Sequence, residues 1–310
     1  MKAQDLISIL LLNACLMVSP LAQAVLPPPD GGYPGGNTAE GQAALFSLTT
    51  GTFNTAVGFF SLRSNTDSSF NTAIGAGALL ANTAFNNTAT GAGALLSNST
   101  GEENTANGAF ALFSNTEGLF NTGVDAFALH GNTTGSQNTA VGNSALVTNT
   151  EGRFNTATGD LALFDNTTGD DNTANGESTL GNNTEGNFNT AIGCRALAAN
   201  TTGDSNTAVG RNTLSAGTDG NSNVALDAGA GSQVTTASDV ICIGTDVGGA
   251  NVDNSCFIGN IHDAVVAPDA VHVLIDSAGK LGTTSGSSRR FKTGIKPMDP
   301  PAKRSSRSNR

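Results

Sequence analysis

A short motif, Asn-Thr-Ala-x-Gly, recurs along this chain with an almost constant period of 17, and this period constrains the fold more than any other feature. Of the eleven intervals between successive motif asparagines, ten equal 17 and one, from Asn71 to Asn87, equals 16. A fixed short period is the signature of an array in which each unit is completed by its neighbours. Units 1 to 12 begin at Asn37, Asn54, Asn71, Asn87, Asn104, Asn121, Asn138, Asn155, Asn172, Asn189, Asn206 and Asn223.

Within a unit, counted from its asparagine as position 0, the same residue types return at fixed places. Position 2 is alanine in eleven of the twelve units, and position 4 is glycine except at Asp125 and Asp227. Position 11 is a second asparagine in nine consecutive units, from Asn65 to Asn200. Position 8 is leucine in eleven units: Leu45, Leu62, Leu79, Leu95, Leu112, Leu129, Leu146, Leu163, Leu180, Leu197 and Leu214.

Each recurring residue type suggests its own structural role. We expect leucine and alanine to stack in inward columns, and glycine to permit the positive φ of a tight corner. The two asparagine columns should form amide ladders that satisfy the turn backbones. The two turn clusters of a unit leave only about six residues between them, too few for a stable helix. We therefore predict an all-β chain: a parallel β-solenoid or β-roll of about twelve rungs, each with two short strands, around Thr-Ala-x and around Ala-Leu.

Large side chains are scarce, because the chain has no Trp, one Tyr and 39 Gly among its 310 residues. A single thin roll would bury little apolar surface against the entropy of ordering it. We therefore expect an oligomer in which position 3 residues such as Val57, Ile74, Val141 and Ile192 pack between chains. A second set of apolar residues, expected to wedge at a corner or at such a seam, precedes the motif asparagine: Phe53, Phe70, Phe120, Phe154 and Phe188.

The two ends of the chain differ from the repeats in composition. Lys2, the apolar stretch 6–18 and Ala22-Gln23-Ala24 form the pattern of a cleaved export signal, with a lipobox ending at Cys15 as a weaker alternative. Residues 25–288 hold five basic and 23 acidic residues, a net charge of −18, which argues against nucleic acid as a partner. No later stretch is long and apolar enough to span a bilayer as a helix. We predict a secreted or cell-surface protein of a bacterium-like cell.

The Asn-Thr-Ala-[Val/Ile]-Gly units over about residues 37–230 resemble the head repeats of trimeric autotransporter adhesins, the YadA-like heads. Those heads fold as a trimer of parallel β-rolls, with shorter repeats that are richer in Ser-x-Ala-x-Gly. The resemblance implies a homotrimer and an adhesive role. Unlike in that family, we expect no C-terminal outer-membrane barrel after the repeats.

Residues 282–298, Gly-Thr-Thr-Ser-Gly-Ser-Ser-Arg-Arg-Phe-Lys-Thr-Gly-Ile-Lys-Pro-Met, resemble the start of the endosialidase-type intramolecular chaperone of tail fibres. In that family the chaperone trimerises the upstream stalk and then cuts itself off. The resemblance implies an autocleavage dyad of Ser287, the nucleophile, and Lys292, its base. The chain ends at Arg310, soon after Lys292, so we expect a truncated chaperone, and we predict that the protein is not an enzyme.

No cofactor or metal site is predicted. His130, His262 and His272 share no ligand spacing. Turn aspartates, among them Asp165, Asp170, Asp171, Asp204 and Asp219, favour solvated turns over calcium sites. Cys242 and Cys256 are left open between a disulfide and free thiols.

The sequence divides into a signal peptide (1–24), a Pro/Gly linker (25–36), the repeat rod (37–230), a β-rich neck (231–282), the chaperone-like start (283–298) and a disordered basic tail (299–310). The leading function is a structural or adhesive fibre whose surface or glycan receptor the sequence does not name. One alternative is a self-processing tail-fibre-like precursor. The other is a monomeric solenoid that binds carbohydrate or ice through the threonines at position 1.

Overall fold

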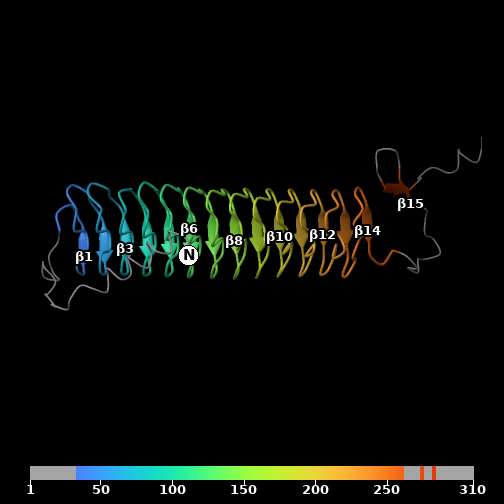
Figure 1. The fold of residues 1–310 in the computed structure, drawn as a ribbon, viewed down its shortest axis with the longest axis horizontal. Coiled ribbons are helices and arrows are strands. Elements are labelled where there is room, and N and C mark those ends of the chain that lie inside the picture. The colour runs from blue at the N-terminus through green and yellow to red at the C-terminus, as the bar shows by residue number, and fades with distance from the viewer. Residues whose placement is uncertain (1–32, 262–272, 276–280, 284–310) are drawn as a thin grey trace, which may run out of the picture. The chain divides into compact units, whose positions relative to one another are not determined.

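The fold is a parallel β-solenoid in which each unit contributes one turn of the coil (Figure 1). A computed structural model describes residues 33–261, 273–275 and 281–283. Fourteen three-residue strands stack in chain order into one sheet, and no helix occurs among the described residues. The strands are β1 Thr38–Glu40, β2 Thr55–Val57, β3 Thr72–Ile74, β4 Thr88–Thr90, β5 Thr105–Asn107, β6 Thr122–Val124, β7 Thr139–Val141, β8 Thr156–Thr158, β9 Thr173–Asn175, β10 Thr190–Ile192, β11 Thr207–Val209, β12 Val224–Leu226, β13 Ile241–Ile243 and β14 Cys256–Ile258.

The strand register follows the sequence repeat. Thr55 pairs with Thr72, and the same step relates most neighbouring strands. The step is one residue shorter between β3 and β4, where Thr72 pairs with Thr88. The sheet continues beyond the motif units through β13 and β14, where Ile241 pairs with Cys256. Two further strands, β15 Val273–Ile275 and β16 Leu281–Thr283, pair with each other as an antiparallel hairpin.

The interior is filled by two columns of alanine and one of leucine. Alanine at position 2 is the buried middle residue of its strand, as in the pattern of β3, and position 7 adds a second small buried residue such as Ala111. Leu112 and Leu129, from successive units, are both fully buried in one continuous core. The predicted inward columns are therefore confirmed, with position 7 as an additional member.

Each unit contains one strand, and the second extended segment predicted around Ala-Leu is wrong. The buried leucines at position 8 have left-handed backbones, with φ of 51° at Leu112 and 53° at Leu129. A left-handed residue interrupts the alternation of a strand. The backbone is still satisfied there: the Leu112 N–H donates to the carbonyl of Ala128 in the next unit (2.9 Å), and the Asn115 N–H donates back to the carbonyl of Leu112 (3.1 Å). The segment is thus a hydrogen-bonded turn.

Position 4 is the corner where glycine is required. Gly142 has φ of 136°, and a Cβ added to it would lie 2.5 Å from the carbonyl oxygen of Gly159 in the next unit. The predicted use of glycine for positive φ is confirmed. Asp125 and Asp227 replace glycine with φ of 94° and 93°, and each carboxylate accepts the N–H of its own following residue. A short polar side chain with a local partner can therefore hold this corner too.

Both asparagine columns are buried and form the predicted ladders. At position 0, the Asn121 backbone N–H donates to Oδ1 of Asn104, one unit earlier (2.9 Å). At position 11, Nδ2 of Asn132 donates to Oδ1 of Asn115 (2.7 Å). The two columns also meet within a unit, because Nδ2 of Asn104 and Nδ2 of Asn115 both donate to the carbonyl of Gly118 (2.8 and 3.0 Å). The asparagines therefore brace the turn from inside and link each unit to the next.

Candidate binding faces

The outward side of the sheet, which we call the strand face, consists of the first and third residues of strands β1 to β14. Threonine occupies the first position of every strand from β1 to β11, in register from Thr38 opposite Thr55 to Thr190 opposite Thr207. These side chains lie outward because the middle alanine of each strand lies inward. Parallel strands are spaced about 4.8 Å apart, so the strand face carries a regular column of hydroxyl and methyl groups.

The third strand positions form a second outward column that is largely aliphatic. Val57, Ile74, Val141 and Ile192 are 37–43% exposed, which is high for large apolar side chains. The column continues with Val209, Leu226 and Ile258 and is interrupted by polar residues, such as Asn107 and Asn175. Thr-x-Thr occurs only in β4 and β8 of these fourteen strands. The strand face therefore combines one hydroxyl column with one apolar column.

A second surface, which we call the turn face, consists of the side chains at positions 6 and 9. On units 5 and 6 it bears Phe110, Phe113, Phe127 and His130, which we call the aromatic ridge. The Phe110 and Phe127 rings stack with centroids 5.5 Å apart, and Phe113 stacks on His130 at 5.2 Å with nearly parallel planes. Burial lowers the pKa of His130 below its usual value near 6.5. His130 thus belongs to an aromatic cluster.

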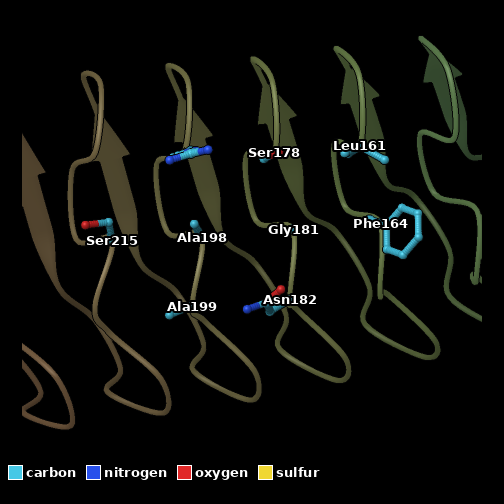
Figure 2. Close-up of a pocket in the computed structure, with 9 residues that line it drawn as sticks. Leu161, Phe164, Ser178, Gly181, Asn182, Ala198, Ala199 and Ser215 are labelled. Atoms are coloured by element: carbon cyan, nitrogen blue, oxygen red, sulfur yellow. The ribbon is translucent and has the colours of Figure 1, made fainter.

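On units 8 to 11 the turn face is hollowed (Figure 2). The hollow has a volume of about 300 Å³ and is open to solvent along one side. Its apolar wall comes from Leu161 and Phe164, and its floor from glycine, alanine and serine on the following units (Figure 2). The lining residues are Leu161, Phe164, Ser178, Gly181, Asn182, Arg195, Ala198, Ala199 and Ser215. Neither the hollow nor the aromatic ridge was predicted from the sequence. The signal of both is the change in side-chain size at positions 6 and 9 along the chain.

The phenylalanines that precede the motif asparagine lie at the corner before each strand. Phe120, Phe154 and Phe188 have φ near 58° and are 50–62% exposed. Phe53 and Phe70, on adjacent units, stack at 5.4 Å. These rings therefore do not wedge into the interior of this chain. Their predicted place at a seam between chains stays a prediction.

Two of the turn aspartates, Asp170 and Asp204, take part in a third ladder, at position 15, that was not predicted from the sequence. The Arg153 N–H donates to the carboxylate of Asp170 (2.6 Å), and the Asn187 N–H donates to the carboxylate of Asp204 (2.6 Å). Between them, the Asp170 N–H donates to Oδ1 of Asn187 (2.8 Å). Across residues 33–261 and the two short strands after them, no three His, Cys, Asp or Glu side chains gather as metal ligands.

The two cysteines of the last strands lie on opposite sides of the sheet. Cys242 is buried opposite Phe257, whereas Cys256 is exposed opposite Ile241, and both are free. Burial raises the pKa of the Cys242 thiol. The question left open by the sequence is therefore answered: the register separates the two thiols.

Ser287, Lys292 and the signal segment 1–24 lie outside the described residues. Autocleavage and export accordingly stay predictions. His262 and His272, for which no ligand role is predicted, also lie outside the described residues. None of the described segments forms a helix with the length and hydropathy needed to cross a membrane. The chain matches no protein-family model, no curated protein and no solved structure.

Proposed function

We propose that the protein is a secreted or cell-surface structural fibre whose solenoid presents long repeating faces for attachment. The observation that carries this proposal is the in-order stack of fourteen parallel strands, in which a ladder of buried asparagines also links the units from Asn37 to Asn223. In such an array each unit is completed only by the next, so the number of units sets the length of the rod. The buried polar groups are used in holding units together, as Asn104 and Asn115 illustrate, which suits a scaffold.

Within this proposal the fibre is a homotrimer that associates through the strand face. Its support is the aliphatic column at the third strand positions, including Ile74 at 42% and Ile192 at 43% exposure. The interior of a single chain holds no side chain larger than leucine in the motif units. Covering the aliphatic column with neighbouring chains would add to that thin core. The resemblance to YadA-like heads also implies a homotrimer.

Sedimentation of the mature full chain tests the trimer. We expect a trimer for the unmodified protein and a monomer for the double variant Ile74→Lys/Ile192→Lys, because two buried ammonium groups per chain would face an apolar seam. The matched control is Glu151→Lys, which adds a cation at an exposed turn and should leave the trimer intact. A monomeric unmodified protein would refute the trimer.

Attachment is tested with beads coated with the same three proteins. Beads coated with the unmodified protein or with Glu151→Lys should be retained on at least one of glass, mucin, cellulose and chitin. Beads coated with the double variant should be retained less, because a monomer lacks the avidity of the trimer. Retention no better than that of beads coated with albumin on every surface would refute an adhesive role. Autocleavage, for which Ser287 and Lys292 are proposed, is tested separately by intact mass, where a cut just before Ser287 is the expected sign.

A second candidate function is supported by the threonine column. Eleven consecutive strands present threonine in register on a flat face, a regular array that could match a periodic surface such as ice or crystalline carbohydrate. A trimer would cover this face, so the two functions exclude each other. This second function would be favoured if a monomer inhibited ice recrystallisation and the variant Thr139→Lys/Thr156→Lys did not. A trimer with neither ice nor carbohydrate activity would exclude it.

A further inference from the structure

Between units 5 and 10 the turn face is bulky at one end and hollow at the other. Units 5 and 6 carry the aromatic ridge, and units 9 and 10 carry Ser178, Gly181, Arg195 and Ala198 at the same two positions. Units 7 and 8, which lie between them, carry Ser144 and Val147, then Leu161 and Phe164. Large and small side chains are therefore arranged on either side of a midpoint between units 7 and 8.

The aromatic ridge is a fixed feature of the surface. Phe110 contacts Phe113 edge-on at 5.8 Å and stacks on Phe127 at 5.5 Å, and His130 contacts both Phe113 and Phe127. Phe110 also leans over Gly93 of the preceding unit, where an added Cβ would lie 2.9 Å from its ring. Four rings on two units thus support one another while Phe127 stays 40% exposed. An apolar ridge of this kind is typical of an interaction site.

We propose that two copies of this chain pack antiparallel through their turn faces, with the aromatic ridge of each copy in the hollow of the other. The two-fold axis lies in the interface between the rods, perpendicular to both of them and level with the gap between units 7 and 8. This axis places unit 5 opposite unit 10, unit 6 opposite unit 9 and unit 7 opposite unit 8. It also keeps position 6 opposite position 6, and position 9 opposite position 9.

The pairs that result on units 5 and 10 match a large side chain with a small or complementary one. Phe113 lies opposite Ala198 of the second copy, and Phe110 lies opposite Arg195. A guanidinium over a phenyl face is attractive, most of all where water is excluded. The same chain already uses this contact on the turn face, since the Arg63 guanidinium lies 4.6 Å from the centroid of Phe60.

The remaining pairs follow the same rule. Phe127 lies opposite Ser178 and His130 opposite Gly181, while at the centre Ser144 faces Leu161. Only Val147 and Phe164 bring two large apolar side chains together, next to the axis, where they close the interface. Parallel rods in register would instead set the aromatic ridge against the ridge and leave the two hollows empty. The size pattern therefore selects the antiparallel arrangement, which is isologous and closes on itself.

This association does not use the strand face, so it is independent of the proposed trimer. A monomer would become a dimer. A trimer exposes three turn faces, one on each chain, so its particle mass would at least double as the concentration rises. Two fibres joined in this way lie side by side and point in opposite directions. The proposal therefore assigns the turn face to contact between opposing fibres.

A charge swap tests the axis as well as the interface. In a symmetric dimer, Phe110 of each copy meets Arg195 of the other, so one chain can carry both halves of a compensating change. We expect Phe110→Lys alone, and Arg195→Glu alone, to raise the dissociation constant of the turn-face association about tenfold or more. Each change removes two cation–π contacts per dimer. The variant carrying both changes should regain most of the lost affinity, because the introduced ammonium then faces the introduced carboxylate across the axis.

The controls use charge changes of the same kind at other surfaces. Phe154→Lys at the exposed corner and Arg211→Glu, an exposed residue outside the hollow, should leave the doubling unchanged. Circular dichroism of all variants at one concentration establishes that each still folds. A mass that never doubles, or a double variant as weak as its singles while correctly folded, would overturn the antiparallel arrangement.

Discussion

Two columns of buried asparagine pass through the short unit between Asn71 and Asn87, and only one of them is continuous there. At position 0, the Asn87 backbone N–H still donates to Oδ1 of Asn71 (3.0 Å). At position 11, Nδ2 of Asn82 donates to the carbonyl of Ala84 (2.7 Å) and not to the preceding asparagine. Oδ1 of Asn65 is left buried with no partner, alone among the side chains of the described residues. From Asn82 onward the ladder resumes, with Nδ2 of Asn98 donating to Oδ1 of Asn82 (2.7 Å).

The difference shows what fixes each column. Position 0 lies immediately before the strand. The strand pairing therefore keeps the asparagines at position 0 aligned across the short unit. Position 11 is held by the turn that follows it, in which Nδ2 normally reaches the carbonyl three residues on, as Asn98 reaches Gly101 (2.8 Å). In the short unit Asn82 reaches the carbonyl two residues on, so its amide is turned away from Asn65. One missing residue therefore breaks one ladder and spares the other.

The largest expected effect comes from replacing an asparagine inside the intact ladder. Asn132→Ala removes the donor to Asn115 Oδ1 (2.7 Å) and the acceptor for Asn149 Nδ2 (2.8 Å). Each buried group left without a partner costs about 1–3 kcal/mol, so we expect a loss of about 2–4 kcal/mol in the free energy of unfolding. Chemical denaturation measures this change.

Asn65→Ala is the matched variant at the broken end. It removes one donor to the carbonyl of Ser68, which still accepts from Asn54 (2.9 Å), and it also removes the unpartnered Oδ1. We therefore expect a change within about 1 kcal/mol of zero. Equal losses for Asn65→Ala and Asn132→Ala would show that the ladder is not the source of the difference.

The next effect comes from repairing the break. A glycine inserted between Ala84 and Phe85 restores the regular length of the unit and the glycine of position 14. Nδ2 of Asn82 should then reach Oδ1 of Asn65, raising the free energy of unfolding by about 1–2 kcal/mol. The same insertion between Gly118 and Leu119, in a regular unit, should be destabilising. If both insertions lower the free energy of unfolding equally, the missing residue does not destabilise the short unit.

Residues that repeat were predictable from the sequence because recurrence itself reports an inward column. The residue types of Leu112 and Ala106 recur in eleven of the twelve units, and that of Asn115 in nine. A column of identical buried groups is the arrangement in which each can meet its equivalents. The continuous sheet and its register follow from the same period. The extended Ala-Leu segment was wrong because leucine is seldom left-handed, and φ of 51° at Leu112 depends on bonds to the next unit that no local pattern reveals.

The binding faces were less predictable, because they depend on residues that do not repeat. Phe110, Phe127 and Arg195 share position 6 with glycine and serine in other units, so they look like variation until the units are stacked. Once the units are stacked, these differences form distinct surface features along the rod, the aromatic ridge at one place and the hollow at another. The same holds for Asn65, whose unpartnered oxygen results from a deletion in the following unit.

The smallest expected effect is that of pH on the comparison between the intact and the broken end of the ladder. Asparagine amides do not titrate, so the gap in stability between Asn132→Ala and Asn65→Ala should be the same at all pH values where the protein folds. Chemical denaturation of both variants across the pH range measures this gap. A gap that changes with pH would show that a titrating group contributes to the difference between the two ends of the ladder.

A pH dependence of stability should instead come from groups whose pKa differs between the folded and unfolded states, such as His130 and Asp227. Because burial lowers the pKa of His130 in the folded state below 6.5, the unfolded chain takes up the proton first, and stability should fall as pH drops through about 6.5. His130→Phe should remove this slope while preserving the stack on Phe113. The pKa of Asp227 is lowered from 3.8 chiefly by the Ala228 N–H, so its contribution to stability is lost only at lower pH, as the carboxylate is protonated. A slope near pH 6 that survives in His130→Phe, measured by denaturation at low protein concentration, would show that another group causes it.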